Sequence, residues 1–403
     1  MVLNLHVSWD EIAAAGRGPE LPSESLSEVP LAARSVAGLS QREQARYRRA
    51  CALLRWGGGA RSLAANDVAL AGLGVYEALL ARSWAVRFGN PQEMTDLAEA
   101  ALAVALALDC RGYGKRRVAD LQARAWGELA NAHRVADRLR SAQRAFGQAF
   151  ALLQNGSGDL YLKARLFDLE ASLLGTLGEF PLALGRLAAL ADLYRELGEP
   201  HLAGRTFLTR ALYTHYSGEA GQAVRLNAEG MELIDRQRDP ELWLHALHNH
   251  LLFLVELGLH RRAKRALFEH RGNLVAKDLV GALRLRALEG RISYGLGELV
   301  SAELAFGEAK QGLARAGLAF QGALGGLELA MVLVRQGRVE EAEREVIAAR
   351  EVFLAQELYR EHVGLMLFLE ESLRRRRATA ELIEHTVAYL RRKELEVGPR
   401  LWR

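Results

Sequence analysis

A pattern that recurs every 40 residues or so constrains the fold of this chain more than any other feature of its sequence. In the last aligned copy, Leu329–Ala349, one apolar helical segment ends at Gln336-Gly337 and a second begins near Glu340. Aligning the copies on the turn residue gives successive spacings of 41, 40, 40, 39 and 40 residues between Asp137, Gly178, Gly218, Gly258, Gly297 and Gly337. A period of this length indicates an array of repeated units, each of which buries its apolar face against its neighbours.

Small and bulky residues keep fixed places within each copy. The position five residues after the turn residue is always alanine: Ala142, Ala183, Ala223, Ala263, Ala302 and Ala342. The position nine residues after it is bulky in all copies except the one with Asn227, the others being Phe146, Leu187, Leu267, Phe306 and Val346. Glycine favours the left-handed conformation that ends a helix, and alanine lets two helices approach closely. Each copy is therefore predicted to be a hairpin of two helices.

This pattern resembles the tetratricopeptide (TPR) repeat. The best copy contains Trp126, Leu129, Ala130, Ala142, Phe146 and Ala149, which match the family's spacing of aromatic, leucine and small residues. The family period is 34 residues, so each helix here would be about one turn longer, as in the long-helix variant of bacterial regulatory and sensor proteins. The proline that often closes a repeat is mostly absent. The resemblance implies an all-α protein, a right-handed α-solenoid of TPR-like helical hairpins.

The repeats divide the chain into four expected segments. These are an N-terminal helical and loop segment at 1–60, a degenerate capping repeat at 61–118, six TPR-like repeats at 119–356, and C-terminal capping helices at 357–403. In the first two segments, Ser40–Glu43 is a capping box that begins a helix, and Gly57–Gly59 breaks the chain. Asn90-Pro91 begins another helix, and residues 109–117 are expected to form a loop.

Charge and composition limit the compartment and the partners. Of 53 basic residues only six are lysines, an arginine bias that indicates genome composition more than a nucleic-acid surface. Cys51 and Cys110 form no metal or redox motif and fit a reducing compartment. Met1–Glu11 lacks the basic region and apolar core of a signal peptide, and no apolar run approaches the ~18–20 residues that span a bilayer. We expect a cytoplasmic protein that binds neither nucleic acid nor membrane.

The sequence carries no signature of an enzyme. Gly57–Gly59 lacks the strand, lysine and hydroxyl residue of a phosphate-binding loop, and no metalloprotease helix, nucleophile elbow or kinase motif is present. We therefore expect no catalytic residues and no cofactor.

TPR-like arrays bind ligands on the concave face, which the first helix of each hairpin lines. The resemblance places there the position thirteen residues before the turn, occupied by Arg124, Arg165, Arg205, His245 and Arg284. The planar guanidinium fork suits carboxylate or phosphate. Two interpretations stay open: an Arg-lined groove for an acidic peptide or anionic ligand, or arginines that each pair with an acid on a neighbouring helix.

Other polar residues of the first helices extend these candidates. Further groove residues are Asn131, Asp168, Ser172, His215, Tyr216, His248, Arg291 and Tyr294. Some TPR proteins clamp a C-terminal carboxylate with lysine and asparagine, but Gly127 stands where that lysine is expected, so this clamp is not inferred here. A second set, eight residues before the turn, predicts a polar network between repeats: Glu170, Arg210, His250 and Glu289. A polar ligand site or pH sensor at His250 is the alternative.

Two further clusters have simple explanations. His245 and His248 share a helix face, but no carboxylate or cysteine stands at ligand spacing beside them, so groove or interface histidines are favoured over a metal site. The run Arg374–Arg377 either meets phosphate or forms a solvated helix end, and the helix dipole favours the second interpretation.

Together these observations predict a non-enzymatic TPR-like scaffold, adaptor or regulator that binds a protein, a peptide or a partner helix in its concave groove. The alternative is a ligand- or peptide-sensing regulatory protein, in transcription or signalling, whose solenoid changes shape on binding a small anionic effector. Association into a homodimer is compatible with either function.

Overall fold

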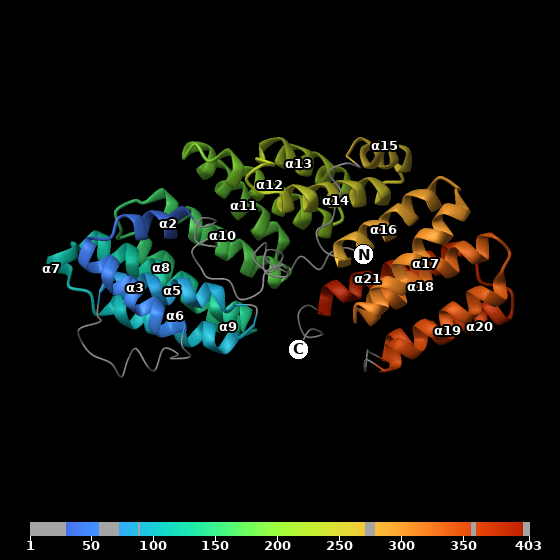
Figure 1. Ribbon diagram of the computed structural model, residues 1–403, viewed down its shortest axis with the longest axis horizontal. Helices are drawn as coiled ribbons and strands as arrows, with labels where there is room; N and C mark the ends of the chain where they lie inside the picture. The colour runs from blue at the N-terminus through green and yellow to red at the C-terminus, as the bar shows by residue number, and fades with distance from the viewer. Residues whose placement is uncertain (1–29, 56–71, 88, 271–278, 356–359, 398–403) are drawn as a thin grey trace. The chain divides into compact units, whose positions relative to one another are not determined.

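A computed structural model describes residues 30–55, 72–87, 89–270, 279–355 and 360–397. All regular secondary structure in these ranges is helical (Figure 1). The chain divides between Ser217 and Gly218 into two compact units, and each is described by itself. The expected breaker at Gly57–Gly59 lies outside the described residues.

The N-terminal unit contains ten described helices. They are α2 (Pro30–Ala37), α3 (Gln41–Arg55), α5 (Leu73–Ala85), α6 (Pro91–Leu106), α7 (Cys110–Tyr113), α8 (Lys115–Val135), α9 (Leu139–Leu153), α10 (Leu160–Thr176), α11 (Phe180–Glu196) and α12 (Pro200–Tyr216). Consecutive helices pack side by side, α3 on α5, α5 on α6, α8 on α9, α10 on α11 and α11 on α12.

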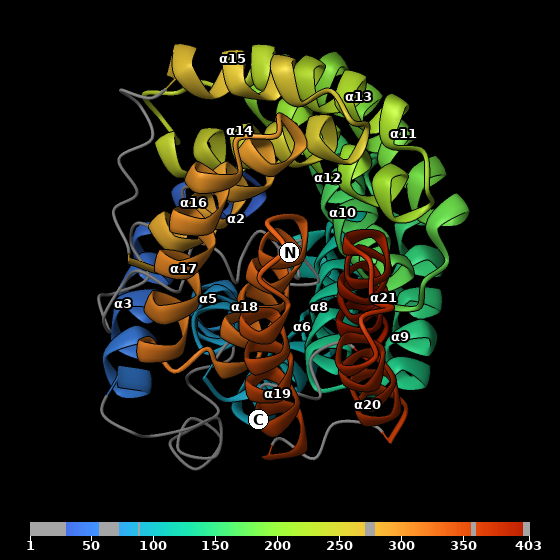
Figure 2. The same cartoon turned by 90° about the vertical axis from the view of Figure 1, so that its right-hand side faces the viewer.

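The C-terminal unit continues the same pattern. Its described helices are α13 (Ala220–Leu233), α14 (Pro240–Glu256), α15 (His260–His270), α16 (Leu279–Gly295), α17 (Leu299–Arg315), α18 (Ala319–Arg335), α19 (Val339–Ala355), α20 (Arg360–Arg374) and α21 (Ala380–Val397). At its end α20 packs on α19, and α21 packs on α18 (Figure 2). The predicted all-α architecture of consecutive packed helices is confirmed for the described residues.

The predicted turns have the conformation that the repeat requires. All six aligned turn residues have positive φ, from 57° at Asp137 to 89° at Gly218. The six alanines that follow them are fully buried. Gly198 and Gly317 also have positive φ and lie where a second helix gives way to the next hairpin, a set of turns that the alignment did not use.

Helix starts agree with the sequence in one place and correct it in another. Asn90 caps α6 by accepting a hydrogen bond from the Glu93 amide at 3.0 Å, as predicted. The expected loop at 109–117 is wrong. The Asp109 carboxylate accepts hydrogen bonds from the amides of Arg111 and Gly112, which stabilises the short helix α7, and α8 begins at Lys115 after a single residue.

Glu43 of the predicted capping box also joins α3 to α5, a contact that the sequence did not predict. The Ser40 hydroxyl accepts from the Glu43 amide at 3.4 Å. The Glu43 carboxylate, however, accepts from the amide of Gly74 at 2.7 Å, in the first turn of α5. A Cβ at Gly74 would lie 2.1 Å from the Glu43 carbonyl oxygen, so α3 and α5 can approach this closely only with glycine there.

Each unit has its own apolar core between the packed helices. In the N-terminal unit Tyr76, Leu79, Met94 and Leu97 are almost completely buried. In the C-terminal unit a core of the same kind joins α18 to α21 around Phe353, Met366 and Ile383. None of the helices in the described part of the chain is long and apolar enough to cross a membrane.

Candidate binding site on the first helices

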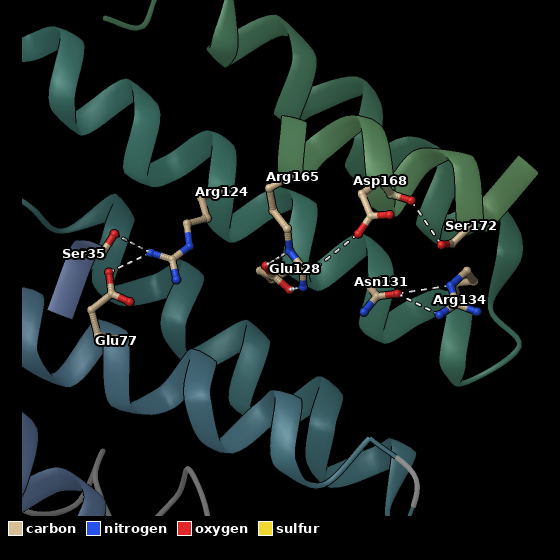
Figure 3. Close-up of polar contacts among 9 residues, drawn as sticks. All are labelled: Ser35, Glu77, Arg124, Glu128, Asn131, Arg134, Arg165, Asp168 and Ser172. Atoms are coloured by element: carbon tan, nitrogen blue, oxygen red, sulfur yellow. Dashed lines mark hydrogen bonds and ion pairs between the residues drawn. The ribbon is translucent and has the colours of Figure 1, made fainter. Parts of the chain in front are cut away.

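A row of polar side chains follows the helices α5, α8 and α10 of the N-terminal unit (Figure 3). We define this polar row by its members: Glu77, Arg124, Glu128, Asn131, Arg134, Arg165, Asp168 and Ser172. Most come from α8 and α10, which are the first helices of successive hairpins, so residues from equivalent positions of the repeat lie along one line.

The first contact in the row is a buried ion pair between α8 and α5. Arg124 donates from Nη1 to Glu77 Oε1 at 2.7 Å, and the two side chains are only 6% and 3% exposed. The same Nη1 donates to the Ser35 hydroxyl of α2 at 3.2 Å. Burial raises the pKa of Glu77, and the Arg124 charge opposes that rise. The pair thus holds two charges away from water at the cost of desolvation.

The second contact joins α10 to α8 and has better geometry. Arg165 donates from Nε and Nη2 to the two carboxylate oxygens of Glu128, at 2.8 and 3.0 Å. Its Nη1 also lies 3.7 Å from Asp168. The guanidinium lies over the Trp84 ring, 4.5 Å from its centroid. Two parallel hydrogen bonds fix both position and orientation of the pair.

Shorter-range contacts complete the row. The Asn131 amide oxygen accepts from Nε and Nη2 of Arg134, at 3.1 and 3.0 Å. The Ser172 hydroxyl donates to the backbone carbonyl of Asp168 at 3.1 Å. Asn131 is buried, whereas Arg134, Asp168 and Ser172 are half-buried. This end of the row therefore offers the more accessible polar groups.

Gly127, where a carboxylate clamp would need lysine, has a packing role instead. A Cβ at this position would lie 2.2 Å from Cδ2 of Leu166 on α10, and Leu166 is fully buried. The missing side chain is what allows α10 to approach α8.

The structure decides the question that the sequence left open for two arginines. Arg124 and Arg165 each form an ion pair with an acid on a neighbouring helix. Their acidic partners, Glu77 and Glu128, were missed by sequence reasoning. Glu128 could have been found from the repeat, because it stands nine residues before its turn residue, as Glu328 does in the last repeat. Glu77 lies outside the aligned repeats, so the repeat pattern could not identify it.

The C-terminal unit contains an ion pair of the same kind. Arg291 of α16 donates from Nε to Glu328 of α18 at 2.6 Å, and both side chains are nearly buried. Tyr294, one turn further along α16, has the Arg335 guanidinium 4.8 Å from its ring centroid.

Burial divides the thirteen predicted groove residues into two sets. Four are buried: Arg124, Asn131, Arg165 and Arg291. Nine are half-buried: Asp168, Ser172, Arg205, His215, Tyr216, His245, His248, Arg284 and Tyr294. The second set contains the residues that a partner can reach.

The predicted network eight residues before the turn is only partly described. Glu170 pairs with Arg186 of α11, and Glu289 pairs with Arg286 of its own helix at 2.6 Å. These two acids therefore make ion pairs within their own hairpins. Burial lowers the pKa of His250, and Arg262 adds to the shift. A link between Arg210 and His250 stays a prediction.

The remaining clusters are placed by the structure as follows. Arg374 pairs with Glu343 and Glu370, Arg375 with Glu371, and Arg376 with Glu340. The basic run is thus largely neutralised by acids of α19 and α20. Among the described residues, no group of three or more His, Cys, Asp and Glu side chains is arranged to hold a metal ion.

These features define a class: an all-helical protein of consecutive packed hairpins with a 40-residue sequence repeat, in which polar side chains of the first helices lie in line. No protein-family model matches the chain, and no curated protein matches its sequence.

Proposed function

We propose that this protein is a non-enzymatic, TPR-like interaction protein, a scaffold, adaptor or regulator that binds a peptide or partner helix along its first helices. The observation that carries the proposal is the polar row. Equivalent repeat positions on α8 and α10 present side chains in one line (Figure 3), which is the arrangement that an extended or helical partner can follow.

The ion pairs change the kind of partner that we propose. Glu77 and Glu128 neutralise Arg124 and Arg165, so the row is not a uniformly basic groove. Its accessible end carries one base, one acid and one hydroxyl, at Arg134, Asp168 and Ser172. A partner with both donors and acceptors fits this surface better than a uniformly acidic peptide, since it can pair with each group in turn.

A charge reversal on the row tests this proposal. Full-length protein and an Asp168→Arg variant are used to capture partners from a lysate of the native source, followed by binding measurements on the purified partner. The matched control is Asp192→Arg on the second helix α11, where the side chain is 76% exposed and pairs only with Arg195 among the described residues.

We expect Asp168→Arg to weaken partner binding at least tenfold while Asp192→Arg leaves it unchanged, with circular dichroism confirming that both variants fold. The proposal fails if no partner is captured, or if the captured partner binds both variants as it binds the wild type.

A further inference from the structure

We propose that α2 is an internal occupant of the partner-binding face, and that a partner helix carrying an arginine next to a hydroxyl residue displaces it. This rests on the proposed function in one respect, namely that the polar row is where a partner binds. The contacts of α2 themselves do not depend on that function.

The first contact places α2 on the buried ion pair of the row. Ser35 accepts a hydrogen bond from Arg124 at 3.2 Å, beside the bond from Arg124 to Glu77 (Figure 3). Its hydroxyl also lies close enough to Glu77 to lower the pKa of that carboxyl, against the rise that burial causes. One small hydroxyl therefore contacts both charges of a pair that joins α5 to α8.

The second contact extends α2 to the next first helix. The Arg34 guanidinium lies over the Tyr161 ring of α10, 4.1 Å from its centroid. The Tyr161 hydroxyl in turn donates to Glu199 at 3.1 Å. Tyr161 stands four residues before Arg165 and so lies on the same face of α10 as the polar row. Two consecutive residues of α2 thus reach α8 and α10, and α2 also packs on α5.

The described side chains of α2 are less buried than those of α3. Of residues 34–37, Arg34 and Ala37 are exposed and the other two are half-buried, whereas Ala50 and Leu54 of α3 are buried in the core. None of these four side chains is buried, and contacts made by exposed or half-buried side chains open at a lower free-energy cost than contacts in a core. The ion pair that α2 contacts also keeps a hydrogen-bond donor unused, because Arg124 bonds Glu77 through a single nitrogen and its buried Nε has no partner among the described residues.

A short connection keeps α2 close to the face when it detaches. Only Gly38–Ser40 separate α2 from α3, which is packed on α5. A tether of this length gives an effective concentration on the order of mM. A partner then binds the fraction of molecules in which α2 is off the face, so its apparent affinity is reduced by that fraction.

The experiment uses the α2 sequence as its own probe. A fluorescent peptide with the sequence of residues 28–39 is titrated into three full-length proteins: wild type, a released variant Arg34→Glu/Ser35→Lys, and an Arg49→Glu control on the exposed side of α3. The released variant places an acid near Glu199 and a lysine against Arg124. We expect the peptide to bind it at least tenfold more tightly than it binds the wild type or the control.

A second variant keeps the test specific. Adding Tyr161→Ala to the released variant removes the ring on which Arg34 stacks, and we expect peptide binding to fall at least fivefold. Hydrogen exchange of the wild type with excess peptide should show faster exchange in residues 34–38.

The outcomes separate the two proposals. Equal peptide binding to wild type and released variant, or binding that does not depend on Tyr161, overturns the inference. If the peptide behaves as expected but the released variant captures partners no better than the wild type, α2 occupies the face as inferred, but its displacement by a partner is overturned. If partners depend on Asp168 but the peptide never binds, the proposed function stands and α2 is not its occupant.

Discussion

The Arg165–Glu128 pair gives the sharpest test of how the first helices are held together. The side chains are 8% and 12% exposed and share two hydrogen bonds. Removing one partner leaves an uncompensated buried charge, which costs about 3–5 kcal/mol. Replacing both by apolar residues removes both charges, and such replacements are often near neutral. We therefore compare Arg165→Met, Glu128→Leu and the double variant.

The expected magnitudes follow from the contacts. Each single variant should lose about 3 kcal/mol of stability. The double variant also loses the contact of Arg165 with Trp84, worth about 0.5–2 kcal/mol, which the methionine thioether partly replaces. If the double variant loses no more stability than one single variant does, the coupling energy between Arg165 and Glu128 is about 3 kcal/mol. The exposed pair Arg195–Asp192, at 3.4 Å, is the control and should couple by less than about 1 kcal/mol.

Because the chain has two compact units, the assay must report on one of them. Native-state hydrogen exchange of the α8 and α10 amides gives the free energy of opening for this part of the N-terminal unit. Additive losses, or losses as small as those of the exposed pair, would refute the account of the polar row as a buried electrostatic link between first helices.

Two further predictions concern packing and pH. Gly147→Ala should raise the unfolding free energy by about 1 kcal/mol through helix propensity, since no described atom lies within 4 Å of the new Cβ. Gly127→Ala should lower the unfolding free energy by up to about 2 kcal/mol, because its Cβ meets buried Leu166. Equal shifts of the two variants in urea midpoint would contradict this prediction. Burial lowers the pKa of His248 to about 3 and also lowers that of His250. The unfolded chain therefore takes up protons that the folded C-terminal unit resists, and the unit should lose stability as the pH falls below 6.5, by at most about 1.4 kcal/mol per pH unit for each histidine. In exchange measurements of α14 and α16, His248→Gln should flatten this profile, and an unchanged profile would show that His248 does not cause it.

The sequence by itself determined the helical hairpins. Each hairpin needs a turn residue with positive φ, which is Asp137 in the first copy and glycine in the others. Five residues later it needs a buried alanine, which allows a close helix contact. Because the requirement is local and repeats six times, alignment of Gly178 with Gly337 was enough to find it. The repeat pattern did not predict the helix at residues 110–113, because that helix depends on capping by a single side chain, that of Asp109, and not on a periodic pattern.

Only the tertiary structure decided what the arginines do. Arg165 finds its acid 37 residues away and Arg124 finds one 47 residues away, and a repeat pattern says which residues are equivalent but not which side chains meet across a helix interface. Likewise, nothing in the sequence PLAARSVA places α2 on the first helices. That position depends on the hydroxyl and guanidinium of two adjacent residues reaching Arg124 and Tyr161, which the fold brings together from distant parts of the chain.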